Sequence, residues 1–217
     1  MCGRFTLTKS IKIIESHFKP ARIRLKYFPS FNIAPNQISA VVTQKSEMTG
    51  MKWGLVPSWA KDTQIGNKLI NARSETLHEK PSFRYPFENQ RCLIPTDGFI
   101  EWKGKQPYYI RFKDHRIFAF AGLWSTWDSG DKPLHTFTII TTEANQTLSA
   151  IHSRMPVIVY PKSYEKWFFD DSRSLTSLFT ATPKNELEYF EISTAINFPK
   201  NNNANLLQPS GQKSFIF

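Results

Sequence analysis

The spacing of hydrophobic positions predicts strands in the middle of the chain. Between residues 91 and 141, apolar residues form short runs or alternate with polar ones, as they do in buried and half-buried strands. GKQP (104–107) and KDHR (113–116) have the composition of hairpin turns between such strands. We expect strands at RCLIP (91–95), GFIEWK (98–103), PYYIRF (107–112), IFAFAGLW (117–124) and LHTFTIIT (134–141).

Helical spacing is confined to shorter segments. Ile11, Ile14 and Phe18 share one face of a predicted helix, for which Thr8 is the expected N-cap. Further helices are expected at 71–80, where Ser74 is the candidate cap, at 143–152, and at 161–169, with Pro161 in the first turn.

The rest of the chain completes one α+β domain. Residues 19–37 carry prolines and have an irregular pattern, and residues 57–70 show no clear period. Residues 196–217 form a polar, Asn-rich tail of uncertain order that ends in apolar residues. We find no internal repeat and no linker, so residues 1–217 are expected to form a single domain dominated by antiparallel strands. Further strands are expected at 38–44, after the turn at 49–50, at 155–160 and at 188–193.

Composition indicates a folded protein with an anionic partner. The 217 residues are 40% hydrophobic and include 18 Phe and 6 Trp, enough for a well-buried core. The formal net charge of +10 suggests a polyanion, and nucleic acid is the usual one. A basic protein without such a partner is the alternative that charge alone leaves open.

The sequence lacks several features that would point to other classes of protein. Residues 1–20 have no apolar core of the length that a secretory signal needs, and no run of residues is long enough to span a membrane. Two cysteines do not form a disulfide framework, so we expect a reducing cytoplasm. The sequence contains no CxxC, HExxH or GxSxG motif and no Gly-rich phosphate loop, so we expect no metal and no cofactor.

Four short stretches combine a reactive side chain with apolar neighbours: MCGRF (1–5), INARSE (70–75), DGFIEWK (97–103) and IHSRMP (151–156). Each reactive residue also has an ordinary structural interpretation. Cys2 is a small apolar residue at the start of a strand, Glu101 a solvated or ion-paired acid, His152 a cation at a helix end, and Asn71 a partner for turn backbone. Taken one at a time, these patterns leave both interpretations open.

Together the stretches resemble the SOS response-associated peptidase (SRAP) family, whose members process abasic sites in single-stranded DNA. The resemblance covers most of the chain up to about residue 195, and the pieces stand in the family's order. It includes MCGRF, FNIAPNQ (31–37), MKWGLVPSWA (51–60), LINARSET (69–76), RCLIPTDGFIEWK (91–103), FAFAGLW (118–124), IITTEAN (139–145) and IHSRMPVIV (151–159).

The resemblance implies a fold and a chemistry. The family fold is a compact α+β unit with a bent or bifurcated, mainly antiparallel sheet flanked by helices. Its nucleophile is the cysteine exposed by removal of the initiator methionine, here Cys2. Supporting roles fall on Asn71, Glu101 and His152. An N-terminal cysteine carries an amine and a thiol on neighbouring carbons, and these can close together on the aldehyde of an abasic sugar to form a thiazolidine. We expect this covalent crosslink to shield the lesion.

Binding roles follow less directly. Arg4, Arg73 and Arg154 lie one or two residues from a proposed catalytic group and are candidates to hold phosphates. Trp59 is a candidate for stacking on bases, whereas core packing is favoured for Trp53. Asn32, Pro35 and Thr142 are further DNA contacts suggested by the family stretches.

The expected partner is single-stranded DNA with an abasic site, bound by a monomer that does not engage membranes. A thiol peptidase acting through an N-terminal nucleophile, for example on its own Met1–Cys2 bond, is the first alternative. A lyase acting on abasic sites belongs to the same chemistry as the crosslink. A non-catalytic binder of single-stranded nucleic acid is the second alternative.

Overall fold

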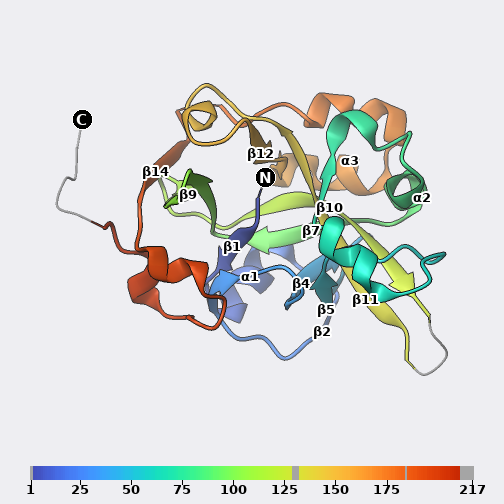
Figure 1. The fold of residues 1–217 in the computed structure, drawn as a ribbon. Coiled ribbons are helices and arrows are strands. Elements are labelled where there is room, and N and C mark those ends of the chain that lie inside the picture. The colour runs from blue at the N-terminus through green and yellow to red at the C-terminus, as the bar shows by residue number, and fades with distance from the viewer. Residues whose placement is uncertain (1, 129–131, 184, 211–217) are drawn as a thin grey trace.

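Two β-sheets, joined where β7 (Arg91–Thr96) of one continues into β8 (Gly98–Lys103) of the other, form the framework of the protein (Figure 1). The computed structural model describes residues 2–128, 132–183 and 185–210. The first sheet has the strand order β14-β9-β8-β1-β3. Its strands are β1 (Arg4–Leu7), β3 (Ser30–Ile33), β8 (Gly98–Lys103), β9 (Gln106–Phe112) and β14 (Leu187–Glu191).

The second sheet is larger and has the order β12-β11-β10-β7-β4-β5-β2, with β13 paired to β10 and β6 paired to β11. Most of its pairs are antiparallel, and β2–β5, β5–β11 and β6–β11 are parallel. Its strands are β2 (Arg22–Arg24), β4 (Ile38–Thr43), β5 (Glu47–Trp53), β6 (Asn71–Arg73), β7 (Arg91–Thr96), β10 (Phe118–Trp127), β11 (Leu134–Glu143), β12 (Arg154–Pro156) and β13 (Ile158–Val159).

This larger sheet forks. β10 and β11 pair from Gly122 and Ile139 to the ends of the hairpin at Trp127 and Leu134. Away from the hairpin end, before Gly122 and after Ile139, the two strands take different partners. There β10 pairs with β13, and β11 pairs with β12. The expected α+β fold with a bent, bifurcated and mainly antiparallel sheet is therefore confirmed.

Helices are short and lie around the sheets (Figure 1). None of the helices in the described part of the chain is long and apolar enough to cross a membrane. The α-helices are α1 (Ile11–Phe18), α2 (Pro81–Asn89) and α3 (Tyr164–Phe169), and the 3-10 turns are η1 (Thr63–Lys68), η2 (Ser74–Thr76), η3 (Leu148–Ala150), η4 (Pro161–Ser163), η5 (Ser172–Leu178), η6 (Thr194–Asn197) and η7 (Ala204–Leu207).

Asp97 lies at the junction of the two sheets, between the end of β7 and the start of β8. Its side chain is buried. One carboxylate oxygen accepts a 2.5 Å hydrogen bond from the Thr6 hydroxyl, and the other accepts 2.6 Å bonds from the hydroxyl and the backbone N–H of Thr8. Thr96, the last residue of β7, donates from its hydroxyl to the Thr6 carbonyl at 2.9 Å. These bonds attach β1 to the point where the chain passes from one sheet to the other.

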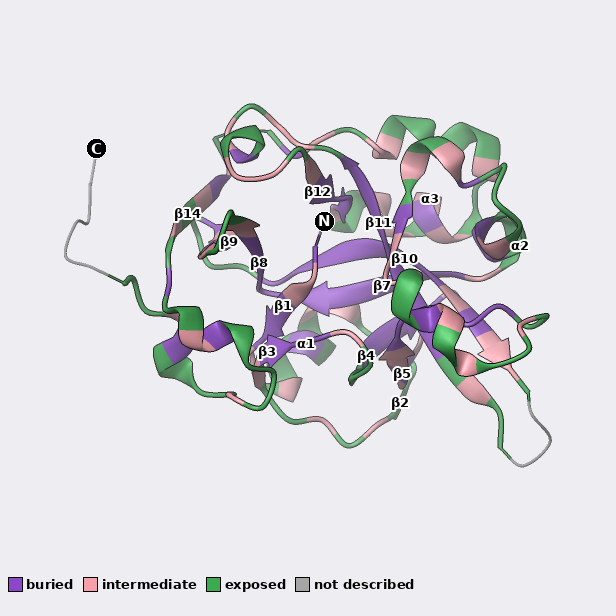
Figure 2. Cartoon of the chain, in the orientation of Figure 1, coloured by how far each residue is buried: buried purple, intermediate pink, exposed green. Residues whose placement is uncertain are grey.

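The core is mostly aromatic and aliphatic, and the strands carry it (Figure 2). Phe5 of β1 packs edge-on against Trp53 and Phe120, with ring centroids 5.1 and 6.0 Å apart. Trp53 is fully buried, so the prediction that it belongs to the core is confirmed. A smaller cluster of Ile100, Tyr109, Ile192, Ile196 and Leu206 packs the C-terminal segment against the five-stranded sheet.

The strands predicted at 38–44, 91–95, 98–103, 107–112, 117–124, 134–141 and 188–193 and the helices predicted at 11–18 and 161–169 are confirmed. The cap of α1 is corrected: Ser10, not Thr8, is the N-cap residue, because Asp97 holds the backbone N–H and hydroxyl of Thr8. The predicted helix start at Ser74 is also wrong. Residues 74–76 form a single 3-10 turn, and α2 begins at Pro81, since a residue before proline avoids helical geometry.

The helix expected at 143–152 is reduced to the turn η3, whose first N–H, that of Leu148, donates to the Asn145 side chain at 2.9 Å. The segment 19–37 is less irregular than expected, because it contains β2 and β3. Both strands depend on distant partners, β5 and β1, which local spacing does not show.

The C-terminal segment is packed as far as the structure describes it. Asn32, Asn201 and Asn202 form hydrogen bonds within this segment or between it and β3, at 2.7–3.1 Å. These amides provide hydrogen-bond partners to backbone of the C-terminal segment and to the Phe31 N–H of β3. The predicted tail therefore begins, at 196–210, as part of the domain, and residues 211–217 of that tail lie outside the described residues.

We predict that Asp97→Ala lowers the free energy of unfolding by about 3 kcal/mol, because it leaves the buried hydroxyl of Thr6 and the polar groups of Thr8 without their acceptor. Urea unfolding measures the loss. Asp114→Ala is the control, since Asp114 is exposed and pairs with Arg116 at the surface, where an ion pair contributes at most about 1 kcal/mol. Equal losses in the two variants would contradict this role for Asp97.

Candidate functional site

Cys2 lies directly before β1 and is fully buried. Its Sγ donates a weak hydrogen bond to the Arg4 carbonyl, at 3.5 Å. Burial raises the pKa of the Cys2 thiol well above its usual value, and the negative charge of Glu101 raises it further. The thiol is therefore protonated at neutral pH.

Glu101 reaches the same place from β8. β1 and β8 pair with Arg4 opposite Ile100, which brings the start of the chain next to Glu101. The Glu101 side chain is 3% exposed, so it is not the solvated acid that its strand pattern alone allowed. Burial raises the pKa of this carboxyl to about 7, which leaves it close to half ionised at neutral pH.

Asn71 approaches Cys2 from the second sheet. It is the first residue of β6, which β11 holds through parallel pairing of Ile139 with Asn71. The Asn71 Nδ2 donates to the Cys2 carbonyl at 2.8 Å. The Asn71 Oδ1 is buried and, among the described residues, has no hydrogen-bond partner. This amide thus fixes the backbone of the cysteine and keeps one acceptor available.

His152 lies between η3 and β12 and contacts the backbone of Arg154. Its Nδ1 is 2.9 Å from the Arg154 nitrogen and 3.2 Å from the Arg154 carbonyl oxygen. The N–H can donate to a neutral ring, and the carbonyl can accept from a protonated one. Burial lowers the pKa of His152, so the ring is mainly neutral at neutral pH. The backbone therefore supports both protonation states of this imidazole.

The four predicted residues come together from four separate segments. The positive charge at the N-terminus of the chain acts on the pKa values of Cys2, Glu101 and His152 alike. Asn71 is joined to Cys2 by its hydrogen bond. A thiol, a carboxyl near half ionisation, an imidazole and an unoccupied amide oxygen thus surround the start of the chain. The described residues include no group of three or more His, Cys, Asp or Glu arranged to hold a metal ion.

The three predicted phosphate-binding arginines differ in how far they are already engaged. Arg73 is exposed at the end of β6. Arg4 donates to the carbonyls of Gly3, at 2.9 Å, and Asn197, at 3.3 Å. Arg154 makes a bidentate pair with Glu75 at 2.6 and 3.0 Å. The Arg154 hydrogen bond lowers the pKa of Glu75, so a phosphate at Arg154 has to compete with that carboxylate.

The other predicted DNA contacts are divided between the surface and the interior. Trp59 is 59% exposed and Pro35 is half-buried. Asn32 is buried and donates its Nδ2 to three carbonyls of the C-terminal segment. Thr142 is also buried and donates its hydroxyl to the Phe179 carbonyl at 2.7 Å. As placed, Asn32 and Thr142 stabilise the fold, and their contact with DNA stays a prediction.

Sequence reasoning missed the part of the site that the C-terminal segment builds. The Asn197 backbone accepts from Arg4, and the Asn197 Oδ1 accepts from Trp102 Nε1 at 2.9 Å. Phe198, the next residue, is 68% exposed. The Asn-rich composition of this region suggested a tail, and the one local indication of structure was the apolar pair Ala195–Ile196.

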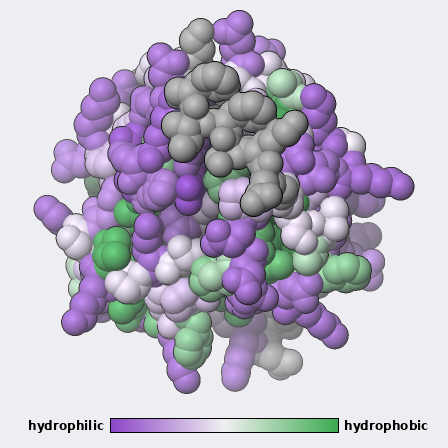
Figure 3. Space-filling model, turned by 90° about the vertical axis from the view of Figure 1, so that its left-hand side faces the viewer, coloured by the Kyte–Doolittle hydropathy of each residue, from purple (hydrophilic) through white to green (hydrophobic). Residues whose placement is uncertain are grey.

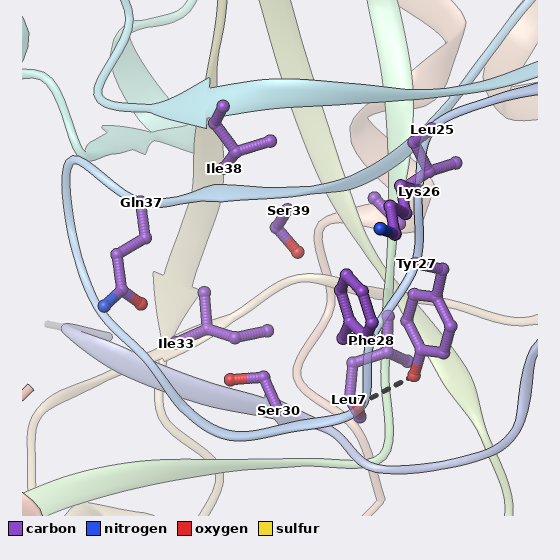
Figure 4. A pocket seen from close by; sticks show the side chains of 11 residues that line it. Leu7, Leu25, Lys26, Tyr27, Phe28, Ser30, Ile33, Gln37, Ile38 and Ser39 are labelled. Carbon is purple, nitrogen blue, oxygen red and sulfur yellow. Dashed lines mark hydrogen bonds between the residues drawn. The ribbon is translucent and has the colours of Figure 1, made fainter. Parts of the chain in front are cut away.

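A separate groove of about 440 Å³ lies at the other end of β1 (Figure 4). Leu7, Ile33 and Ile38 line it, together with Lys26 and Phe28 of the loop that precedes β3. Tyr27 fixes that loop by donating its hydroxyl to the Leu7 and Lys9 carbonyls at 2.9 and 2.7 Å. None of the residues that surround Cys2 lines this groove, so it is not the site of the cysteine chemistry.

Comparison with known proteins relates this arrangement to one family. The sequence model described as SOS response associated peptidase (SRAP) matches residues 1–199. The chain is 43% identical to the abasic site processing protein YoaM of Bacillus subtilis, over 95% of this chain and 97% of that protein. It is 41% identical to the abasic site processing protein YoqW of Bacillus subtilis, over 96% and 99% of the two chains. For the abasic site processing protein HMCES of Gallus gallus, the identity is 31%, over 85% of this chain and 67% of that protein.

Solved structures show the same fold. A crystal structure of a protein from Bacteroides thetaiotaomicron superposes with a TM-score of 0.85 at 26% identity, over 96% of this chain and all of that one. A phage-related protein of Bordetella bronchiseptica gives a TM-score of 0.69 at 26% identity, over 88% of this chain and 94% of that one.

We predict that Glu101 makes the protein less stable as the pH rises. Between its ordinary pKa of 4.5 and about 7, the folded protein keeps a proton that the unfolded chain releases. The unfolded state then binds fewer protons, so the free energy of unfolding falls with rising pH. Relative to Glu101→Gln, which cannot ionise, wild type should lose about 2–3 kcal/mol between pH 5 and pH 8. Urea unfolding across this range measures the difference, and parallel pH profiles would refute the raised pKa.

Proposed function

The chain belongs to the SOS response associated peptidase (SRAP) family, and on that premise we propose that it processes abasic sites in single-stranded DNA through a covalent crosslink at Cys2. Relatives at 41% and 43% identity over nearly the whole chain are named abasic site processing proteins. The observation that carries the proposal is the assembly of Asn71, Glu101 and His152 around the start of the chain.

The chemistry requires that Met1 is removed, because the nitrogen of Cys2 is otherwise an unreactive amide. The free amine attacks the C1′ aldehyde of the ring-opened sugar, and loss of one water gives a Schiff base. The Cys2 thiol then adds to the same carbon, and its proton passes to the imine nitrogen. The product is a five-membered thiazolidine with the base-less sugar attached.

The raised pKa of the thiol supports this order of events. A buried, protonated thiol next to a carboxylate is a poor first nucleophile. It becomes effective once the amine has captured the sugar, because its attack is then intramolecular, an advantage of up to about 7–11 kcal/mol. A thiol peptidase needs the opposite, a thiolate that attacks first. The environment of Cys2 therefore favours aldehyde capture over peptide cleavage.

Glu101 is suited to control the proton of the amine. Its pKa of about 7 lies close to the reference value of about 7.7–8.0 for an α-amine. Proton exchange between groups of similar pKa is fast and reversible, so the carboxylate can accept the ammonium proton and return it when the carbinolamine loses water.

His152 and Asn71 are suited to the sugar. Opening of the sugar ring moves a proton from the C1′ hydroxyl to the ring oxygen, and a neutral imidazole can take up this proton and deliver it to the ring oxygen. The Arg154 backbone provides a partner for Nδ1 before and after this transfer. The buried Oδ1 of Asn71 is a ready acceptor for a sugar hydroxyl or for the thiazolidine N–H.

Single-stranded DNA would bind along the basic surface near this site. Arg73 is exposed two residues after Asn71, and Trp59 is exposed as a stacking platform. We propose a preference for single strands because Cys2 is buried, so the lesion has to leave the base stack to reach it.

We predict that Cys2→Ala abolishes the crosslink. Wild type, shown by mass spectrometry to lack Met1, is mixed with single-stranded DNA carrying one abasic site and run on a denaturing gel, where a slower covalent band is expected. Cys2→Ser should give a more labile band, because it can close only an oxazolidine. Cys92→Ala is the matched control, since Cys92 is the other buried thiol and has no amine beside it.

A heat-stable band from Cys2→Ala at the wild-type yield would refute the thiazolidine. A complex that disappears on denaturation would instead support a non-catalytic binder. Cleavage of peptide substrates without a DNA adduct would support the peptidase.

We predict that His152→Ala slows crosslinking by about 10²–10⁴-fold at pH 7, the usual contribution of a general acid or base. Glu101→Gln should slow it similarly. His135→Ala is the control, since His135 is exposed on β11. The crosslinking time course and the melting temperature are measured on the same variants. A lowered melting temperature with an unchanged rate would make His152 a structural residue.

A further inference from the structure

The C-terminal segment that follows β14 holds one large aromatic side chain in solvent next to the candidate site. Phe198 is 68% exposed, although it directly follows the turn η6, whose Ile196 is fully buried. Figure 3 shows the side of the molecule that carries this segment, where hydrophobic side chains stand as separate patches among hydrophilic ones. An exposed aromatic ring offers a flat apolar face on which a nucleic-acid base can stack.

Hydrogen bonds hold the backbone of Phe198 on both sides of its peptide unit. The Phe198 carbonyl accepts from Asn32 Nδ2 at 3.1 Å and from the Asn201 N–H at 3.0 Å. The Phe198 N–H donates to the Ala195 carbonyl at 3.3 Å. Asn32 is itself buried and holds two further carbonyls of the same segment. The backbone that carries the Phe198 ring is therefore held in place by the buried Asn32.

Hydrogen bonds place the backbone next to Phe198 close to the start of the chain. Arg4, two residues after Cys2, bridges the Gly3 carbonyl at 2.9 Å and the Asn197 carbonyl at 3.3 Å with one guanidinium. Trp102, the neighbour of Glu101, donates to the Asn197 side chain at 2.9 Å. Residues next to both Cys2 and Glu101 thus contact the residue that precedes Phe198.

We propose that Phe198 binds single-stranded DNA by stacking on the base next to the abasic site. Positive charge lies near it, because Arg4 donates to the carbonyl of the preceding residue and Lys200, two residues further along the chain, is exposed. A negatively charged strand requires such charges. A base that flanks a lesion has lost one stacking neighbour, and a fixed aromatic ring replaces it at low entropic cost. This inference rests on the proposed function and adds a recognition residue to it.

The role predicted for Asn32 changes with this proposal. Sequence resemblance suggested that Asn32 contacts DNA, whereas its side chain is buried against the C-terminal segment. In this proposal it is a positioning residue, because it holds the carbonyl of Phe198.

The test measures non-covalent affinity, so that it does not depend on the crosslink. The probe is a fluorescent single-stranded oligonucleotide with one tetrahydrofuran residue, an abasic analogue that has no aldehyde. Fluorescence anisotropy should show roughly 5- to 100-fold weaker binding for Phe198→Ala, the usual effect of losing one stacked base. Phe198→Trp should bind like wild type, and Phe198→Leu should bind like Phe198→Ala.

Phe169→Ala is the matched control, because Phe169 at the end of α3 is also 68% exposed. It should leave the affinity unchanged. Phe198→Ala should keep the wild-type melting temperature, since the side chain it removes is exposed.

A second oligonucleotide identifies stacking as the cause. It carries tetrahydrofuran at the lesion and at both neighbouring positions, so that no adjacent base remains. Wild type should bind this oligonucleotide more weakly than the first one. On this oligonucleotide Phe198→Ala should bind as tightly as wild type, because no adjacent base is left to stack on. A Phe198→Ala penalty that persists on this oligonucleotide, or wild-type affinity of Phe198→Ala on the first one, would overturn the proposal. Failure of wild type to crosslink would refute the proposed function without affecting these affinities.

Discussion

The hydrogen bonds that Asp97 accepts from Thr6 and Thr8 are the contacts on which the arrangement of the molecule depends. They attach β1 at the junction of the two sheets, where β7 of one sheet continues into β8 of the other. Because Cys2 directly precedes β1, its position follows from this attachment. The same junction starts β8, which carries Glu101. One buried carboxylate therefore sets both the meeting of the sheets and the meeting of two reactive groups.

Burial then determines the chemistry that these groups can perform. It raises the pKa of Glu101 to about 7 and raises that of the Cys2 thiol, and it lowers the pKa of His152. The first shift brings a carboxyl into the range where protons exchange near neutral pH, and the last keeps the imidazole mainly neutral there. The second keeps the thiol protonated at neutral pH. Burying Glu101 lowers the stability of the folded protein at neutral pH and above. The same burial gives the groups the pKa values that suit the aldehyde capture we propose.

Much of the fold and the four central residues could be predicted from the sequence. Strands such as β7, β8 and β10 have strong local patterns, and the family motifs carry Cys2, Asn71, Glu101 and His152. Prediction failed where distant partners outweighed local preference. β2 and β3 form because β5 and β1 pair with them. The segment 196–210 is ordered by asparagine side chains that meet backbone groups from elsewhere in the chain, which no local pattern reveals.

The sequence by itself determined the reactive groups, because a cysteine next to the initiator methionine is the one residue that can present an amine and a thiol on adjacent carbons. It also determined the family, through motifs whose order is preserved. Only the tertiary structure decided which interpretation of each group holds. Glu101 is buried rather than solvated, Asn32 holds backbone in the interior, and Phe198 is exposed beside Arg4. Burial and hydrogen bonding arise between segments far apart in the chain, so they exist only once the two sheets have packed together.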